Sequence, residues 1–269
     1  MGLNKYYNKW KKFQIEINDE KEALKAIQMI PSDLKYVVNQ TDEICLTAVN
    51  LDPYVLEFVR DKKPEICFAA LNKSGFVIRY IDNPTEEMCL AAVKNNGSVI
   101  KYIDNPSDKV CWTSLEKSIE NIEYIKNPTE EMCIFCLEKE PWLIRYIKKQ
   151  NKKMHELALS NNSYGNIRYL INPSKEDILK CLENGISLNS ISEIYHTEEI
   201  CIKAIEFDVN NYYSINNKTN AIYLATVKKD GRFLTVLPEK NRTYEVCLAA
   251  VEQNESVLKY VPMKYFQNI

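Results

Sequence analysis

The residues of this sequence best suited to chemistry are its nine cysteines, because a thiolate can bind a metal ion, form a disulfide or act as a nucleophile. Five of them recur at a constant spacing of 22 residues: Cys45, Cys67, Cys89, Cys111 and Cys133. Packed helices lie about 8–10 Å apart, whereas a disulfide needs Cα atoms within roughly 7 Å and zinc needs closer sulfurs. The same spacing continues to His155 and, after a slip of one residue, to Ile178, which no series of metal ligands would accept. We therefore interpret the cysteines as small buried hydrophobic residues.

No other arrangement of reactive side chains indicates catalysis. Cys133 and Cys136 form a CxxC motif, but it lies inside an expected helix, whereas redox motifs of this kind typically open a helix after a strand. The two histidines, His155 and His196, fall at a core-facing position and in a turn. No nucleophile signature stands near either histidine, and the chain has no glycine-rich phosphate loop. We therefore expect a protein that is not an enzyme and that uses no metal or cofactor.

A basic residue precedes a recurring aromatic residue, and these basic residues form a candidate binding stripe for nucleic acid or a protein partner. The stripe consists of Lys35, Arg79, Lys101, Arg145, Arg168 and Lys259. It could follow a phosphate backbone while bases stack on the rings. However, Glu57 and Glu123 interrupt it, and the tyrosines are flanked by aliphatic residues at helical spacing. We therefore expect the rings to lie in the core.

The elements that must position these residues form a repeat, which is clearest from Pro84 to Asn105. Thr85 is a suitable N-cap, and the two glutamates after it suit the first turn of a helix. We expect this helix to run for about ten residues with one apolar face, and Asn96 and Gly97 to end it in the left-handed conformation. A second, shorter helix and an Asp-Asn-Pro turn complete the unit.

Helices this short are not stable alone, but stacking buries the apolar face of each one against its neighbours. The sequence therefore predicts an all-α solenoid of about eleven stacked 22-residue two-helix repeats with atypical terminal caps. We expect a single α-solenoid domain over 1–269, with an N-terminal cap at 1–17, repeats at 18–261 and a C-terminal cap at 262–269. The pattern weakens at 185–196, where we expect a bend or an irregular helix.

Composition narrows the classes of partner. The 35 lysines and arginines nearly balance the 37 aspartates and glutamates, so the chain has no overall charge that points to nucleic acid. No apolar run is long enough for a transmembrane segment. The odd number of cysteines inside helical patterns indicates reduced thiols and a cytoplasmic location. The basic and aromatic residues at 5–13 suit either a cap helix or an element that touches an anionic surface.

The segments Glu87 to Tyr102 and Glu245 to Tyr260 resemble a short helical repeat of unknown function, typical of giant viruses that infect amoebae and also found in bacteria and protists. The resemblance covers nearly the whole chain, most closely 41–148 and 241–261. It implies a helical-repeat fold and a viral protein acting in a host cell, in the host cytoplasm or the virion. It carries no catalytic residues.

Two functions agree with these observations. The first is a non-enzymatic scaffold or adaptor that binds a protein partner, because solenoids present long surfaces on which a few aromatic and arginine residues anchor a partner. The alternative is a helical-repeat protein that binds RNA or DNA through the basic and tyrosine stripe.

Overall fold

The computed structural model describes residues 16–266, and within them the chain is all-helical. Eleven α-helices, α2 to α12, alternate with 3₁₀ helices, here called η1 to η14, and the only β contact in this range is an isolated bridge between Ile17 and Val37. The α-helices are α2 (Glu20–Met29), α3 (Asp42–Leu51), α4 (Pro64–Lys73), α5 (Glu86–Asn95), α6 (Asp108–Lys117), α7 (Glu130–Lys139), α8 (Lys152–Ala158), α9 (Lys175–Glu183), α10 (Glu198–Phe207), α11 (Asn220–Lys229) and α12 (Tyr244–Gln253).

A 3₁₀ helix follows each α-helix. These are η1 (Pro31–Tyr36), η2 (Pro53–Phe58), η3 (Gly75–Tyr80), η4 (Gly97–Tyr102), η5 (Ile119–Tyr124), η6 (Pro141–Tyr146), η7 (Tyr164–Tyr169), η8 (Leu188–Ser190), η9 (Glu193–Tyr195), η10 (Val209–Ser214), η11 (Gly231–Thr235), η12 (Glu239–Asn241), η13 (Glu255–Tyr260) and η14 (Met263–Tyr265). The segment at 185–196, where the repeat pattern weakens, contains the three-residue helices η8 and η9 in place of one six-residue helix. This agrees with the irregularity expected there.

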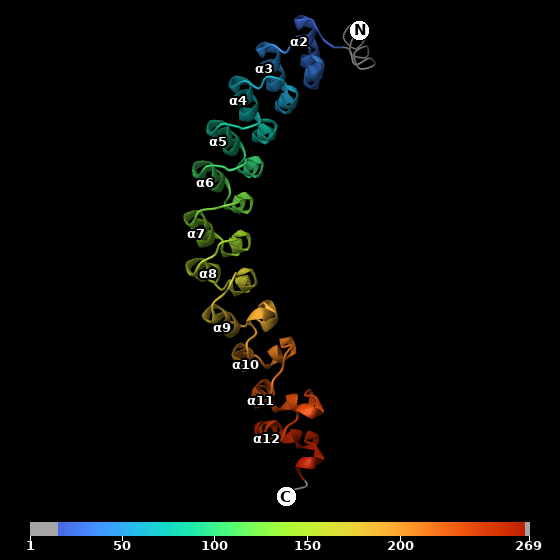
Figure 1. The fold of residues 1–269 in the computed structure, drawn as a ribbon, viewed down its shortest axis with the longest axis vertical. Coiled ribbons are helices and arrows are strands. Elements are labelled where there is room, and N and C mark those ends of the chain that lie inside the picture. The colour runs from blue at the N-terminus through green and yellow to red at the C-terminus, as the bar shows by residue number, and fades with distance from the viewer. Residues whose placement is uncertain (1–15, 267–269) are drawn as a thin grey trace. The chain divides into compact units, whose positions relative to one another are not determined.

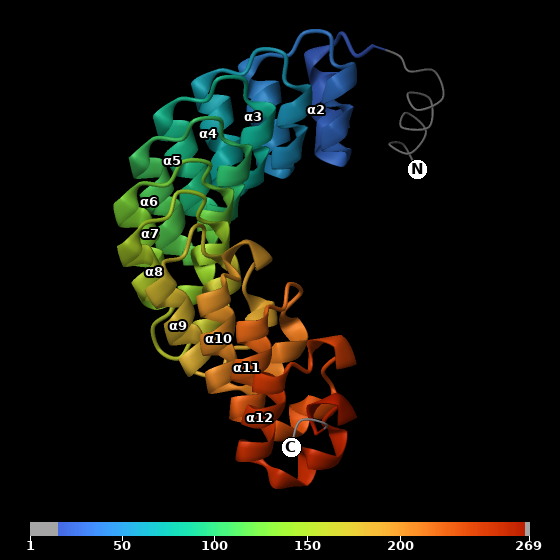
Figure 2. The ribbon, with the colours of Figure 1, turned by 60° about the horizontal axis from the view of Figure 1, so that its bottom comes forward.

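The chain forms two compact units, Met1–Met132 and Cys133–Ile269, which we describe separately. In each unit the α-helices stand side by side in one layer and the 3₁₀ helices in a second (Figure 1; Figure 2). Each α-helix packs on the next, from α2 to α6 in the first unit and from α9 to α12 in the second. The prediction of an all-α fold with helices packed in succession is confirmed. None of the helices described is long and apolar enough to cross a membrane.

The α-helices begin where the sequence predicts. The Thr85 side chain accepts a hydrogen bond from the Met88 amide at 3.3 Å and starts α5, with Glu86 and Glu87 in its first turn. Buried apolar residues then fall on one face of each helix; in α5 they are Met88, Cys89, Ala92 and Val93. A threonine or serine cap of the same kind begins α3, α6, α9, α10, α11 and α12.

The expected left-handed end at Asn96 and Gly97 is wrong. Asn96 is extended (φ −147°), and Gly97 opens η4 without a positive φ. Glycine is needed for space instead, because a Cβ atom on Gly97 would lie 2.6 Å from the Asn121 amide nitrogen and 2.8 Å from Cβ of Lys117. Three of the left-handed residues are asparagines that precede the prolines of the inter-repeat turns, Asn83 (φ 51°), Asn105 (φ 50°) and Asn172 (φ 53°), and the others are Asn161, Asn162 and Gly185.

The predicted caps are only partly covered by residues 16–266. Most of the N-terminal cap at 1–17, including the basic and aromatic segment at 5–13, lies outside the described residues, as do 267–269 of the C-terminal cap. At the N-terminal side, Ile17 is buried and pairs with the backbone of Tyr36 and Val38. At the other end, Tyr265 of η14 packs edge-on against Tyr244 and donates its hydroxyl proton to the Arg242 carbonyl at 3.0 Å.

Candidate binding surface

In the first unit, basic residues of the 3₁₀ helices lie between aromatic rings of consecutive repeats. Lys101 Nζ is 5.1 Å from the ring centroid of Tyr102 in its own helix and 5.6 Å from that of Tyr124 in η5. Lys35 Nζ is similarly 4.8 Å from the Tyr36 ring and 5.8 Å from the Phe58 ring. These are cation–π distances. We call the predicted basic residues, with the rings they contact, the basic–aromatic ladder.

Arg79 belongs to the ladder through two rings and a hydrogen bond. Its Cζ atom lies 4.8 Å from the Tyr80 ring and 5.8 Å from the Tyr54 ring, and one guanidinium nitrogen donates to the Tyr80 hydroxyl at 2.8 Å. This hydrogen bond raises the pKa of Arg79 above its ordinary value. The guanidinium is therefore a fixed positive charge that lies across the aromatic rings.

The second unit contains the remaining predicted basic residues. Arg145 lies over three rings, with its Cζ atom 5.2 Å from Trp142, 5.5 Å from Tyr146 and 5.5 Å from Tyr169. Lys259 lies 5.1 Å from Tyr260. Arg168 directs its Nε proton to the Gly165 carbonyl at 3.2 Å. Arg145 thus repeats the arrangement of Lys101, in which one cation contacts rings of two consecutive 3₁₀ helices.

The expectation that the tyrosine rings lie in the core is wrong. Tyr102, for example, is 39% exposed and Tyr124 is 37% exposed. The helices that carry them are 3₁₀ rather than α, and in η4 the buried side chains are Val99 and Ile100. Ile100 and Ile103 take the buried side, and the tyrosine before Ile103 lies at the edge of the surface.

The ladder presents positive charge and aromatic surface together, interrupted by acidic residues. Glu57 and Glu123 are exposed at the positions where other repeats have a lysine or arginine. The ring faces are partly covered by the chain's own cations, whereas Lys101 and Arg145 are themselves exposed. Their N–H groups can therefore donate to carboxylates or carbonyls of a ligand, and the exposed parts of the rings offer apolar contact.

The cysteines lie in the core. All nine are buried. Burial raises the pKa of Cys45 and Cys111 to about 11 and that of Cys136 and Cys181 to about 12, far from a reactive thiolate. Among residues 16–266, no group of three or more histidine, cysteine or acidic side chains is arranged to hold a metal ion. These observations agree with the interpretation of the cysteines as packing residues.

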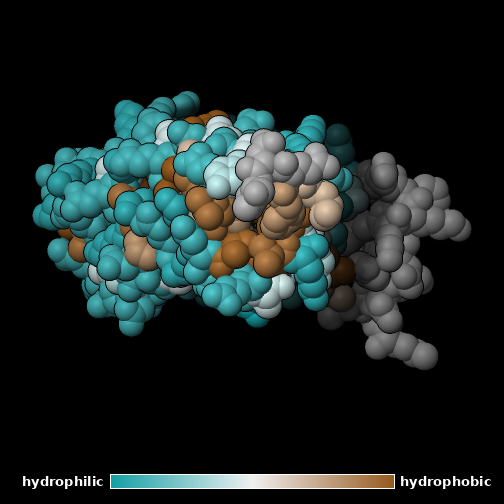
Figure 3. Space-filling model, turned by 90° about the horizontal axis from the view of Figure 1, so that it is seen from below, coloured by the Kyte–Doolittle hydropathy of each residue, from teal (hydrophilic) through white to brown (hydrophobic). Residues whose placement is uncertain are grey.

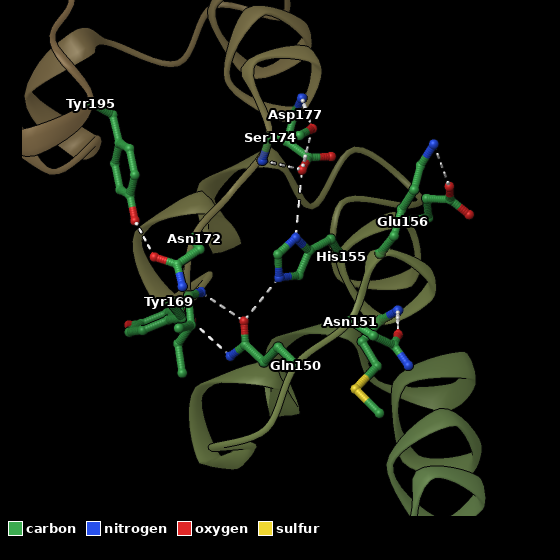
Figure 4. Close-up of polar contacts among 12 residues, drawn as sticks. Gln150, Asn151, His155, Glu156, Tyr169, Asn172, Ser174, Asp177 and Tyr195 are labelled. Atoms are coloured by element: carbon green, nitrogen blue, oxygen red, sulfur yellow. Dashed lines mark hydrogen bonds and ion pairs between the residues drawn. The ribbon is translucent and has the colours of Figure 1, made fainter.

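His155 has an arrangement that the sequence alone did not reveal (Figure 4). Its Nδ1 atom lies 3.5 Å from Asp177 Oδ2, and its Nε2 atom lies 3.2 Å from Gln150 Oε1. Ser174 is also present, but its hydroxyl donates to Asp177 at 2.7 Å and caps α9. A serine nucleophile would have to face the histidine ring, and the Ser174 hydroxyl faces Asp177 instead. The His155 ring joins α8 to α9 through its contact with Asp177.

The residue before each N-cap is a further position that sequence reasoning missed. It is proline in several repeats, and elsewhere it is a side chain that donates to backbone carbonyls: Gln40, Lys62, Gln150, His196, Lys218 and Arg242. Gln150, for example, donates to the Ile147 carbonyl at 2.9 Å and the Tyr169 carbonyl at 3.0 Å, and accepts from the Ile171 amide at 2.8 Å. His196 is thus part of a turn. The sequence could have revealed this position, because the residues that occupy it recur about every 22 residues.

Compared with known proteins, the chain matches no family model, no curated protein and no solved structure.

Proposed function

We propose that the protein is a non-enzymatic scaffold or adaptor that binds a protein partner through the basic–aromatic ladder. The observation that carries this proposal is the placement of Lys101 and Arg145, each between rings of consecutive repeats. Tyrosine, tryptophan and arginine dominate the binding energy of protein interfaces, because they combine a large apolar area with directed hydrogen bonds. The ladder concentrates these residue types on one layer of each unit.

The same geometry favours a protein over a nucleic acid. Bases stack on free aromatic faces, and here intramolecular cations occupy part of those faces. A phosphate backbone would also pass the exposed carboxylates of Glu57 and Glu123, which repel it. An extended peptide can place acidic side chains beside the lysines and arginines and neutral or basic ones beside these glutamates.

The number of repeats, the cellular compartment and the viral origin are part of the same proposal. The alternation from α2 to α12 supports about eleven two-helix repeats of 22 residues in an α-solenoid. The burial of all nine cysteines in the helical core supports a reducing compartment such as the cytoplasm. The resemblance to the repeats of giant viruses supports a viral protein that acts in a host cell.

The test compares two double variants of the full chain as bait in the native cell, followed by quantitative mass spectrometry. The ladder variant is Arg79→Ala with Lys101→Ala, and the control is Lys94→Ala with Lys109→Ala, which removes the same charge from α5 and α6. We expect a protein partner that the wild type and the control retain and the ladder variant loses.

Two outcomes would refute this function. One is a partner retained equally by both variants. The other is recovery that nuclease treatment abolishes, together with low-salt binding of generic single-stranded RNA or DNA that the ladder variant loses. That second result would assign the ladder to nucleic acid.

A further inference from the structure

The end of the second unit carries an exposed apolar surface. It is formed by α12, η13 and η14, and the exposed large hydrophobic residues that line it together are Tyr244 (60%), Leu248 (45%), Leu258 (49%) and Phe266 (39%). Figure 3 shows brown, hydrophobic residues gathered on this end of the second unit. We call it the α12 end face. Contiguous apolar surface of this kind on a protein marks an interaction site.

The repeat register shows what normally covers such a surface. The residues equivalent to Leu258 in the first unit include Leu56, Ile78 and Ile100, which are 0%, 1% and 1% exposed. Each of them belongs to a 3₁₀ helix that packs against the following α-helix, as η2 does on α4 and η3 on α5. The α12 end face is therefore shaped to receive an α-helix of another repeat.

The first repeat described is not a suitable occupant from another copy. At the two positions that are apolar and buried in the next repeat as Ile44 and Val55, it carries the exposed Glu22 and the partly buried Asp33. Burying these carboxyl groups against the α12 end face would leave charges without partners in an apolar contact. Head-to-tail stacking of copies is thus disfavoured.

Charged residues of both signs lie on the elements that form the α12 end face. Lys259 and Lys264 are exposed on the η13 and η14 side, and Glu252 is exposed on α12. Glu206, the equivalent of Glu252, lines the groove between α10 and α11, and the backbone carbonyl of Glu206 accepts a hydrogen bond from Lys229 of the following helix. By the repeat register, Glu252 therefore lies on the edge of α12 that would border a partner.

We propose that two copies of the chain associate through their α12 end faces about a two-fold axis, with α12 of each copy against η13 of the other. This arrangement covers Leu248 and Leu258 of both copies. It also brings Glu252 of one copy towards the lysines of the other, and a two-fold interface forms each such contact twice. Because the two-fold arrangement uses the same face on both copies, it closes at the dimer.

The experiment is sedimentation-velocity centrifugation of the full chain over a wide concentration range, with Leu258→Glu and a matched control, Leu51→Glu. Leu51 is 53% exposed at the end of α3, so both variants place a carboxylate at an exposed leucine. We expect a concentration-dependent monomer–dimer equilibrium for the wild type and the control, and at least a tenfold weaker dimer for Leu258→Glu. Circular dichroism confirms that each variant is folded.

A charge exchange tests the two-fold geometry. Lys264→Glu and Glu252→Lys should each weaken the dimer, and the double variant should recover much of the loss because the pair is restored with its signs reversed. The proposal is overturned if the wild type remains monomeric throughout, if it forms open polymers, if both leucine variants dissociate equally, or if the charge effects simply add.

Discussion

Gly75→Ala adds a single carbon atom at a place where the repeats have no room for it. The new Cβ atom would lie 2.4 Å from the Ala92 carbonyl oxygen and 3.2 Å from its carbon, both of them backbone atoms of α5. Relief would require α5 to move away from η3 by about 1 Å, and overpacking of this kind typically costs about 1–3 kcal/mol. Alanine restricts the unfolded chain and returns about 0.4–1 kcal/mol, so we expect a net loss of roughly 1–2 kcal/mol.

Gly165→Ala is the matched control. No atom lies within 4 Å of the position that its Cβ atom would take, and its φ is not positive. The same restriction of the unfolded chain should therefore stabilise this variant by about 0.4–1 kcal/mol. The assay is urea unfolding of both variants followed by circular dichroism, with hydrogen exchange to locate the change, because repeat arrays can unfold in parts. Equal stability of the two variants, or unchanged exchange in α4 and α5, would refute the reasoning.

Three further predictions concern buried polar groups and ionisation. Asn211 accepts from the Leu188 amide at 2.8 Å and donates to a carbonyl of α10 at 2.9 Å, so Asn211→Leu should cost about 1–3 kcal/mol for each orphaned group, measured by urea unfolding. The pKa of about 12 for Cys136 leaves less than about one thiol in a thousand ionised at pH 8, so the native protein should react with Ellman's reagent far more slowly than the unfolded chain, and fast labelling in the native state would contradict this. Hydrogen bonds from Arg232 hold the pKa of Asp230 below its ordinary value. The ionised Asp230 therefore adds at most about 1 kcal/mol to the free energy of unfolding; this is fully present above about pH 4 and is lost as the pH falls through the folded-state pKa. Asp230→Asn should remove this part of the decrease in stability at acidic pH.

The sequence predicted the features that depend on local chemistry. A threonine followed by acidic residues starts a helix wherever it occurs, because its hydroxyl satisfies an amide of the first turn and the acidic residues favour the helix dipole, and Thr85 and Thr243 do this in the structure. The identity of the core residues followed from the spacing of Cys89 and Ala92, since an α-helix with one apolar face must bury it.

The errors came from features that depend on the neighbouring repeat. Gly97 was expected to adopt a positive φ, but it is required because the Asn121 side chain and Lys117 come so close. That proximity exists only when η4 is stacked on α6. The tyrosines were assigned to the core because aliphatic residues flank them at helical spacing, whereas Tyr102, the last residue of η4, is 39% exposed. The sequence did predict the basic stripe, but the contact of Lys101 with a ring of the next repeat, Tyr124, required the stacked geometry.

The repeat can diverge in sequence without losing its turns, because the position before the N-cap has a physical requirement that several residues meet. Proline at this position restricts the turn through its fixed φ and leaves no amide to satisfy. Gln150, His196 and Arg242 hold the turn differently, by donating to backbone carbonyls such as that of Ile191, 3.0 Å from the ring of His196. The segment around His196 lacks the Asn-Pro signature, yet its turn is held, and Thr197 caps α10 at the position that the register predicts. Replacing His196 with leucine should therefore loosen this turn, whereas glutamine, which donates as Gln150 does, should preserve it.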